Sequence, residues 1–233
     1  MNPLHLVSGG AAQGLVGQLQ ARFEAATGVG IEASFGAVGL MQDNLLSGAP
    51  CDVVILTDAL ITQLQQQGHV VRGSAVALGV VRTGIAVKAG QALPDVGSAT
   101  ALSALFRKAS EIYFPDPVKA TAGIHFMKVL KALGLDQELA ARMRPFPNGA
   151  TAMREMALAT GDDQVGCTQV TEILYTPGVR LVGPLPKRFE LATLYTAAVC
   201  TQATQPGVAA QLIAMLSDEN AAPLRIAGGF ESS

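Results

Sequence analysis

The feature that most constrains the fold is a regular alternation over residues 4–68. Short apolar runs such as Leu4–Val7 alternate with stretches of helical periodicity, and glycines or small polar residues separate them. In residues 11–27, apolar side chains recur at the spacing of one helix face, and Gly28 ends the pattern. Strand, helix, strand, helix, strand is the order of a parallel sheet with right-handed crossovers.

The pattern changes at residues 76–88, a long β-rich stretch that no helix follows directly. A second series of strands and helices then begins, and another β-rich stretch comes at residues 191–200. Two such stretches on either side of a middle lobe predict a two-stranded hinge. We therefore expect an α/β protein with two Rossmann-like lobes of mixed or parallel sheets and a ligand cleft between them. The expected lobes are residues 1–80 plus 196–233, and residues 81–195.

Composition narrows the function classes. The chain has 233 residues, of which 49% are hydrophobic and 15% charged, so it can bury a real core. A formal net charge of −2 gives no electrostatic footprint for nucleic acid. No apolar run approaches the 18 residues of a membrane span. We expect neither nucleic acid nor membrane insertion, and the composition leaves the oligomeric state open.

The cysteines and histidines predict no metal and no cofactor. Cys51, Cys167 and Cys200 have a spacing that fits neither a zinc site nor a redox pair, and the three histidines lie far apart. We expect small buried thiols, which suit a reducing compartment. No basic start and long apolar run precede the first strand, as a secretory signal requires. The sequence as written therefore predicts a cytoplasmic protein, or a periplasmic one if it is a mature fragment.

Four strand-to-helix turns are built from small residues. Each should present backbone N–H groups at a helix N-terminus, where the helix dipole favours negative charge. Ser8 and Thr151 add hydroxyl groups, and both are natural N-caps. The turn after the first strand matches neither the dinucleotide fingerprint nor a phosphate loop, which disfavours nucleotides. The turns are "SGGA" (8–11), "GAVG" (36–39), "PDPVKATAG" (115–123) and "PNGAT" (147–151).

Several stretches, in order along the whole chain, resemble the molybdate-binding proteins of ABC transporters, which belong to the periplasmic solute-binding class (type II). They include "SGGAAQGL" (8–15), "LLSGAPCDVVIL" (45–56), "DPVKATAGIHFMKVLKALGL" (116–135), "VGCTQVTEI" (165–173) and "VAAQLIAMLSDENAAPLRIAGGF" (208–230). The resemblance implies two α/β lobes closing over a small oxyanion, and a transporter permease as partner if the chain is exported. It implies ligand contacts at Ser8, at Ala122 and near Thr151 or Ala152. With neighbouring turn residues, the expected ligand-binding set is Ser8, Gly9, Gly10, Ala37, Val38, Gly39, Thr121, Ala122, Thr151, Ala152, Thr168 and Gln169.

Two departures from the family point away from molybdate. The second turn has Val38 and Gly39 where the family usually offers a serine, and Gln169 stands where it offers a tyrosine. A hydrogen bond to a charged group contributes roughly 1.5–3 kcal/mol, so losing two hydroxyls would weaken the grip on a tetrahedral oxyanion. A glutamine amide can donate or accept, which suits a carboxylate or hydroxyl. We expect a small anion, an organic di- or tricarboxylate in preference to molybdate.

The sequence is compatible with an enzyme as well as with a binder. Aconitate isomerase, which moves a double bond in a tricarboxylate, is an enzymatic relative of this fold, so the chain could be a cytoplasmic, cofactor-independent isomerase. Such an enzyme needs a base and an acid. The candidates are His125, expected in the first turn of a helix whose N-terminus favours the neutral form of its imidazole, with Asp116 and Lys119 flanking the same turn. Two further functions stay open, an oxyanion receptor of an ABC transporter and an effector-sensing domain.

Overall fold

The computed structural model describes residues 2–232, and in it the chain forms two compact units. Unit 1 comprises the described residues of Met1–Val81 and Thr193–Ser233, and unit 2 is Arg82–Ala192. The chain leaves unit 1 within strand β4 (Val76–Lys88) and returns to it within strand β9 (Ala192–Val199). Within residues 2–232, no helix combines the length and the apolar character that crossing a membrane requires.

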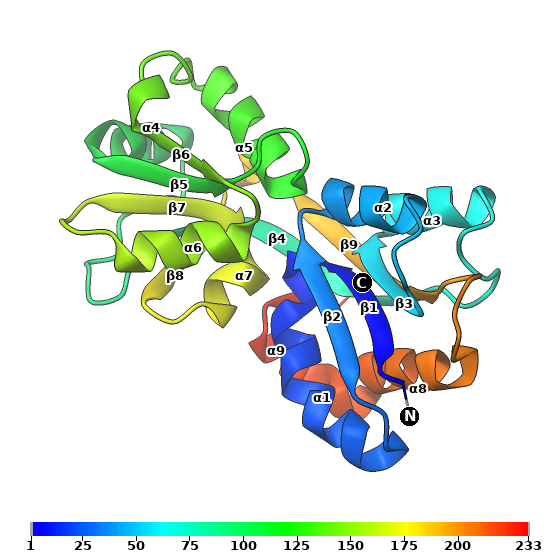
Figure 1. Ribbon diagram of the computed structural model, residues 1–233. Coiled ribbons are helices and arrows are strands. Elements are labelled where there is room, and N and C mark those ends of the chain that lie inside the picture. The colour runs from blue at the N-terminus through cyan, green and yellow to red at the C-terminus, as the bar shows by residue number, and fades with distance from the viewer. Residues whose placement is uncertain (1, 233) are drawn as a thin grey trace. The chain divides into compact units, whose positions relative to one another are not determined.

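The sheet of unit 1 has three parallel strands and one antiparallel strand, in the order β2 (Ile31–Gly36), β1 (Leu4–Gly9), β3 (Val53–Thr57) and β9. A short strand, β10 (Phe230–Glu231), pairs antiparallel with the start of β4. Figure 1 shows helices on both faces of this sheet. One face carries α1 (Gln13–Thr27), α8 (Pro206–Ser217) and α9 (Ala222–Ala227), and the other carries α2 (Val38–Leu46) and α3 (Asp58–Gln66).

Gly28 ends α1 in the left-handed conformation, with φ +70°, as the sequence predicts. α1 and α2 lie on opposite faces because both crossovers are right-handed and run in opposite directions across the sheet. The connection from β1 to β2 runs one way, and the connection from β2 to β3 runs back past β1.

The sheet of unit 2 has the order β4, β7 (Gln164–Gln169), β5 (Glu111–Pro115) and β6 (Met143–Phe146), with β8 (Val179–Pro184) also paired to β4. β7 runs antiparallel to β4, whereas β5 is parallel to both β7 and β6. The helices of this unit are α4 (Ala99–Lys108), α5 (Thr121–Ala132), α6 (Gly149–Leu158) and α7 (Val170–Tyr175).

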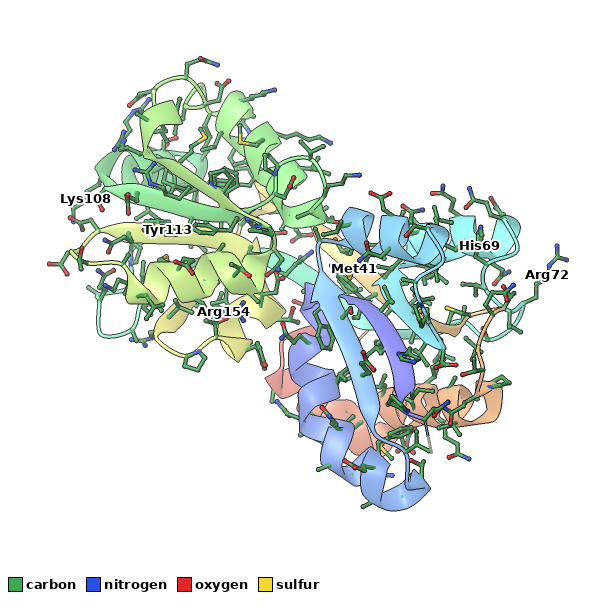
Figure 2. All side chains as sticks on the ribbon, viewed as in Figure 1. Met41, His69, Arg72, Lys108, Tyr113 and Arg154 are labelled. Carbon is green, nitrogen blue, oxygen red and sulfur yellow. The ribbon has the colours of Figure 1, made fainter. Side chains whose placement is uncertain are left out.

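Unit 2 buries a separate cluster on each face of its sheet. Ile112 and Phe114 of β5 point to the side of α4 and α5, where Phe126 packs at 5.1 Å from the Phe114 ring. Tyr113, between them, points to the side of α6 and stacks on Phe146 at 5.8 Å (Figure 2). This period of two is the alternation of a strand buried on both faces.

Unit 1 is held at one end of its sheet by a buried carboxylate. Asp52, just before β3 and 1% exposed, accepts the backbone N–H groups of His5 at 2.8 Å, Thr204 at 2.7 Å and Gln205 at 3.2 Å. The Thr204 hydroxyl adds a fourth hydrogen bond at 3.1 Å. One side chain therefore joins β1, β3 and the start of α8.

Candidate functional site

The first turn of unit 1 is closely packed. Ser8 is fully buried, and its hydroxyl donates to the Gly9 carbonyl at 2.9 Å. After Gly9 the chain makes one turn of 3₁₀ helix, Gly10–Ala12, before α1 begins. A Cβ at Gly9 would lie 2.8 Å from Val38 Cγ1 and 3.2 Å from Tyr195 Cε1, so this position requires glycine.

The second turn of unit 1 lies against the first. Ala37 is the N-cap of α2, and Val38, the first helical residue, packs its buried side chain on Gly9. Gly39, the next residue, is half-buried. The 3₁₀ turn and α2 both begin without a side-chain cap. Backbone amides in a first helical turn lack intrahelical partners, so these two N-termini suit an anion.

In unit 2, the turn before α5 is also built on close backbone packing. A Cβ at Gly123 would lie 2.3 Å from the carbonyl oxygens of both Pro115 and Asp116, which only glycine allows. Ala120 is the N-cap of α5 and offers no polar side chain. Thr121 is half-buried and Ala122 is buried. The N-terminus of α5 therefore shares the properties of the two in unit 1.

The fourth turn differs because the protein's own side chains occupy it. Asn148 is the N-cap of α6, and its Oδ1 accepts the Thr151 N–H at 2.8 Å. The Glu172 carboxyl accepts the backbone N–H groups of Gly149 and Ala150. Thr151 was expected as an N-cap, but it lies inside the first turn of α6, because the asparagine before the helix already caps it.

Side chains pack tightly around this capped N-terminus. A Cβ at Gly149 would lie 1.9 Å from Thr168 Oγ1 and 2.0 Å from Glu172 Oε2. The Ala152 N–H bonds the Asn148 carbonyl at 3.0 Å, and Thr151 Oγ1 accepts from Arg154 at 3.0 Å. Figure 2 shows Arg154 on α6. The expected contacts at Thr151 and Ala152 thus have internal hydrogen-bond partners in this structure.

Thr168 and Gln169 end β7, and both are buried. The Thr168 hydroxyl donates to Glu172 Oε2 at 2.5 Å, and Gln169 is the N-cap of α7. Burial is the main cause that raises the pKa of Glu172, and the hydrogen bonds from Thr168, Ala150, Gln169 and Gly149 oppose it. Sequence reasoning missed Glu172, because an acidic residue in the first turn of a helix gives no sign that its carboxyl reaches α6.

The three candidate catalytic residues all lie near the start of α5. Asp116 Oδ1 accepts the N–H groups of Val118 at 2.6 Å and Lys119 at 2.9 Å, which shapes the turn. His125 lies in the second turn of α5, not the first, with its Nε2 2.8 Å from the Phe189 carbonyl oxygen. The Lys119 side chain is exposed.

Within residues 2–232, no three His, Cys, Asp or Glu side chains gather in a way that could hold a metal ion. The structure brings Ser8, Gly9 and Gly10 next to Ala37 and Val38 in unit 1. In unit 2 it brings Thr168 next to the start of α6. Two groups of small residues and helix N-termini therefore exist, one in each unit.

Comparison with known proteins gives the family. The model of a family described as bacterial extracellular solute-binding protein matches residues 4–231. The chain belongs to this solute-binding family. Its sequence is 27% identical over 225 residues to an aconitate isomerase from a Pseudomonas species, covering 94% of this chain and 84% of that protein.

Solved structures agree on the fold of this solute-binding protein. The periplasmic molybdate-binding protein of Azotobacter vinelandii matches with a TM-score of 0.81 at 20% identity, over 99% of both chains. The sulfate-binding protein SubI of Mycobacterium tuberculosis matches with a TM-score of 0.75 at 19% identity, over 100% of this chain and 87% of that one. The fold is the type II periplasmic binding protein fold, as the sequence predicts.

Proposed function

We propose that this solute-binding protein binds a small organic di- or tricarboxylate through backbone amides at helix N-termini. The observation that carries the proposal is the contrast among the four turns. Three of them, before α1, α2 and α5, begin with small residues and no side-chain cap. The fourth, before α6, is filled by Asn148 and Glu172. The uncapped amides are those we assign to the ligand.

The side chains at these turns support a carboxylate over a tetrahedral oxyanion. Val38 presents methyl groups at the start of α2 and packs on Gly9. The Ser8 hydroxyl donates its proton to the Gly9 carbonyl. At these two turns, neither Ser8 nor Val38 therefore supplies a hydroxyl donor to a tetrahedral oxyanion. A planar carboxylate needs fewer donors, because two adjacent backbone amides can hold its two oxygens. The similarity to an aconitate isomerase points to the same ligand class.

The test is titration calorimetry with a panel of di- and tricarboxylates, molybdate and sulfate. Two matched pairs of variants test the helix N-termini. Gly39→Asp places a negative charge at the start of α2, with the neutral Gly39→Asn as its control. Thr121→Asp does the same at the start of α5, with Thr121→Asn as its control. Aspartate suits a helix N-terminus, so folding should be kept. We expect each Asp variant to bind a polycarboxylate at least about tenfold more weakly than its Asn control, a cost of about 1.4 kcal/mol. Equal affinity within a pair would remove that helix from the site.

A second candidate function is isomerisation of an unsaturated polycarboxylate, and the relative that is named aconitate isomerase favours it. A base would remove a proton beside one carboxylate and an acid would return it elsewhere. His125, Asp116 and Lys119 are the candidates for these roles. Proton NMR in D₂O, with the protein and each acid, separates the two functions. New isomer signals or deuterium uptake would make the protein an enzyme, and unchanged substrate with line broadening would make it a binder.

A third candidate function is that of a molybdate or sulfate receptor of an ABC transporter. It is supported by the shared fold of the molybdate-binding protein and SubI, and by the extracellular description of the family. In that case the chain would act outside the cytoplasm and deliver its ligand to a permease. Tight binding of molybdate or sulfate in the same calorimetry, with no polycarboxylate bound, would favour it over the first two.

A further inference from the structure

Two cysteines that are 149 positions apart in the sequence meet in unit 1. Cys51 lies just before β3 and Cys200 just after β9, and the two sulfur atoms are 3.2 Å apart. The Cys200 thiol donates to Cys51 Sγ, and the Cys51 thiol donates to the Val53 carbonyl at 3.2 Å. Both thiols are free and buried.

Sheet pairing fixes this juxtaposition. Val53 of β3 pairs with Val199 of β9 in an antiparallel register, which sets the two cysteines on adjoining strand ends. The Cys200 N–H donates to the Asp52 carbonyl at 3.0 Å, one residue from Cys51. The pair is therefore held by backbone hydrogen bonds and does not depend on side-chain packing alone.

A cavity of about 480 Å³ is lined by both cysteines. Its lining includes Cys51, Cys200, His5, His69 and Thr204. Figure 2 shows His69, which follows α3. His5 lies near the start of β1, so the cavity is at the opposite end of that strand from Ser8 and Gly9. It is distinct from the turns assigned to the anion.

We propose that Cys51 and Cys200 are a modification site that forms a reversible disulfide by exchange with a low-molecular-weight disulfide. A disulfide needs a sulfur–sulfur distance of about 2.05 Å, so the two sulfurs must approach by roughly 1.1 Å. Rotation of the two side chains about their Cα–Cβ bonds is the movement that the proposal requires. The third thiol, Cys167, belongs to the buried core of unit 2 and takes no part.

The exchange has two steps that balance. Cys51, the more exposed of the two at 7%, attacks one sulfur of the small disulfide and releases the first small thiol. Cys200 then attacks Cys51 Sγ, forms the protein disulfide and releases the second small thiol. The two protein thiols lose two electrons, the small disulfide gains them, and the two protons pass to the released thiols.

The environment of Cys200 disfavours its thiolate, which is the form that attacks in the second step. In the reduced pair, the hydrogen bond to Cys51 is the largest cause that raises the pKa of Cys200, followed by burial and then by the electrostatic effects of Cys51 and Asp52. Because the thiolate is the attacking form, the closure of the disulfide should speed up as pH rises. The finished bond would link the start of β3 to the end of β9 and close a long loop, which restricts the unfolded chain.

The test uses the whole native protein and oxidised glutathione as the probe. After incubation and denaturation, free thiols are blocked with a maleimide, and intact mass and non-reducing peptide mapping follow. We expect one blocked thiol in place of three, a Cys51–Cys200 cross-linked peptide, and full reversal by dithiothreitol. We also expect a melting temperature several degrees higher in the oxidised protein.

Variants separate the pair from other chemistry. Cys167→Ser should still form the cross-link and leave no thiol to block, whereas Cys51→Ser and Cys200→Ser should form none. The peptide map of the unmodified chain decides the matter even if a variant folds poorly. Three blocked thiols after exposure of the native protein, a cross-link through Cys167, or stable glutathione adducts without a cross-link would each overturn the proposal.

Discussion

At the residue scale, Glu172 is an acidic residue whose carboxyl is buried and hydrogen-bonded inside unit 2. Its carboxyl is buried between β7 and α6, and burial raises its pKa above the ordinary value of 4.5. The folded chain therefore binds a proton more readily than the unfolded chain between pH 4.5 and the folded-state pKa. In that range, the contribution of Glu172 to the free energy of unfolding must fall as pH rises.

The pH dependence of the Glu172 contribution can be measured by comparison with a variant that cannot titrate at this position. The free energy of unfolding of the natural protein, minus that of Glu172→Gln, should decrease as pH rises from about 4.5 towards neutrality. Glutamine does not titrate, so the difference isolates this one group from the other carboxyls. Denaturant unfolding of both proteins at several pH values measures it. A difference that stays flat, or that grows with pH, would show that the amides of Gly149 and Ala150 hold the carboxylate charged throughout.

A second prediction at this scale concerns Gly149. An alanine there would place its Cβ 1.9 Å from Thr168 Oγ1 and 2.0 Å from Glu172 Oε2. We expect Gly149→Ala to lower the free energy of unfolding by at least about 2 kcal/mol. Gly207, in the first turn of α8, has nothing within 4 Å of such a Cβ and is the matched control. Gly207→Ala should be neutral or slightly stabilising; similar losses in both variants would mean that close contact is not the cause.

At the element scale, hydrogen bonds to the Asp52 carboxylate connect β1, β3 and the start of α8. Burial alone would raise its pKa, but the hydrogen bonds from His5, Gln205 and Thr204 hold the pKa below its ordinary value of 3.8. We expect Asp52→Asn to cost about 2–4 kcal/mol, because an amide N–H₂ would face backbone donors. Urea unfolding at neutral pH measures this loss.

The same carboxylate has a pH signature of opposite sign to that of Glu172. Its stabilising contribution is present above pH 3.8 and is lost as pH falls through the lowered folded-state pKa. The gap between the natural protein and Asp52→Asn should therefore narrow on acidification below about pH 3.8. A gap that is constant down to the acid transition would assign the loss to packing and not to the charge.

Elements with clear periodicity could be predicted from the sequence, and elements defined by distant partners could not. The strand at residues 76–88 has the predicted bounds, and the helix predicted over residues 11–27 ends at Thr27 as expected, because β-branched runs and a left-handed glycine are local signals. That helix begins two residues later than predicted, at Gln13, because residues 10–12 form a 3₁₀ turn. Strand β6 was missed, since Met143–Phe146 contains an arginine and a proline and lies at a sheet edge. The bounds of α7 could not be predicted because six residues carry too little periodicity.

The candidate site shows the same limit. The small residues of the turns indicate where backbone amides lie, and the structure puts helix N-termini there. Nothing local indicates that Glu172 reaches the amides of Gly149 and Ala150. The spacing of Cys51 and Cys200 likewise fits no known thiol motif, although β3–β9 pairing brings them to 3.2 Å. Both contacts depend on which distant strands and helices lie side by side, and local sequence patterns do not specify that.

At the scale of the whole molecule, unit 2 is one continuous segment, whereas unit 1 is made from both ends of the chain. Unit 2 has its own core on each face of its sheet. Its two ends meet within the unit, because the Thr83 N–H donates to the Leu191 carbonyl at 3.1 Å. A segment with its own core and adjacent ends has the properties of an inserted domain that can fold alone.

We therefore expect residues 82–192, expressed alone, to fold with a cooperative thermal transition and dispersed amide NMR signals. A stability of several kcal/mol is reasonable for a domain of this size. Leu130→Ala, which removes a fully buried side chain between α5 and the sheet, should cost about 2–5 kcal/mol in the isolated unit and in the whole chain alike. If the isolated segment shows no cooperative transition, the two buried clusters of unit 2 require unit 1 in order to form. The chain must then be treated as one folding unit, although each unit has a hydrophobic core of its own.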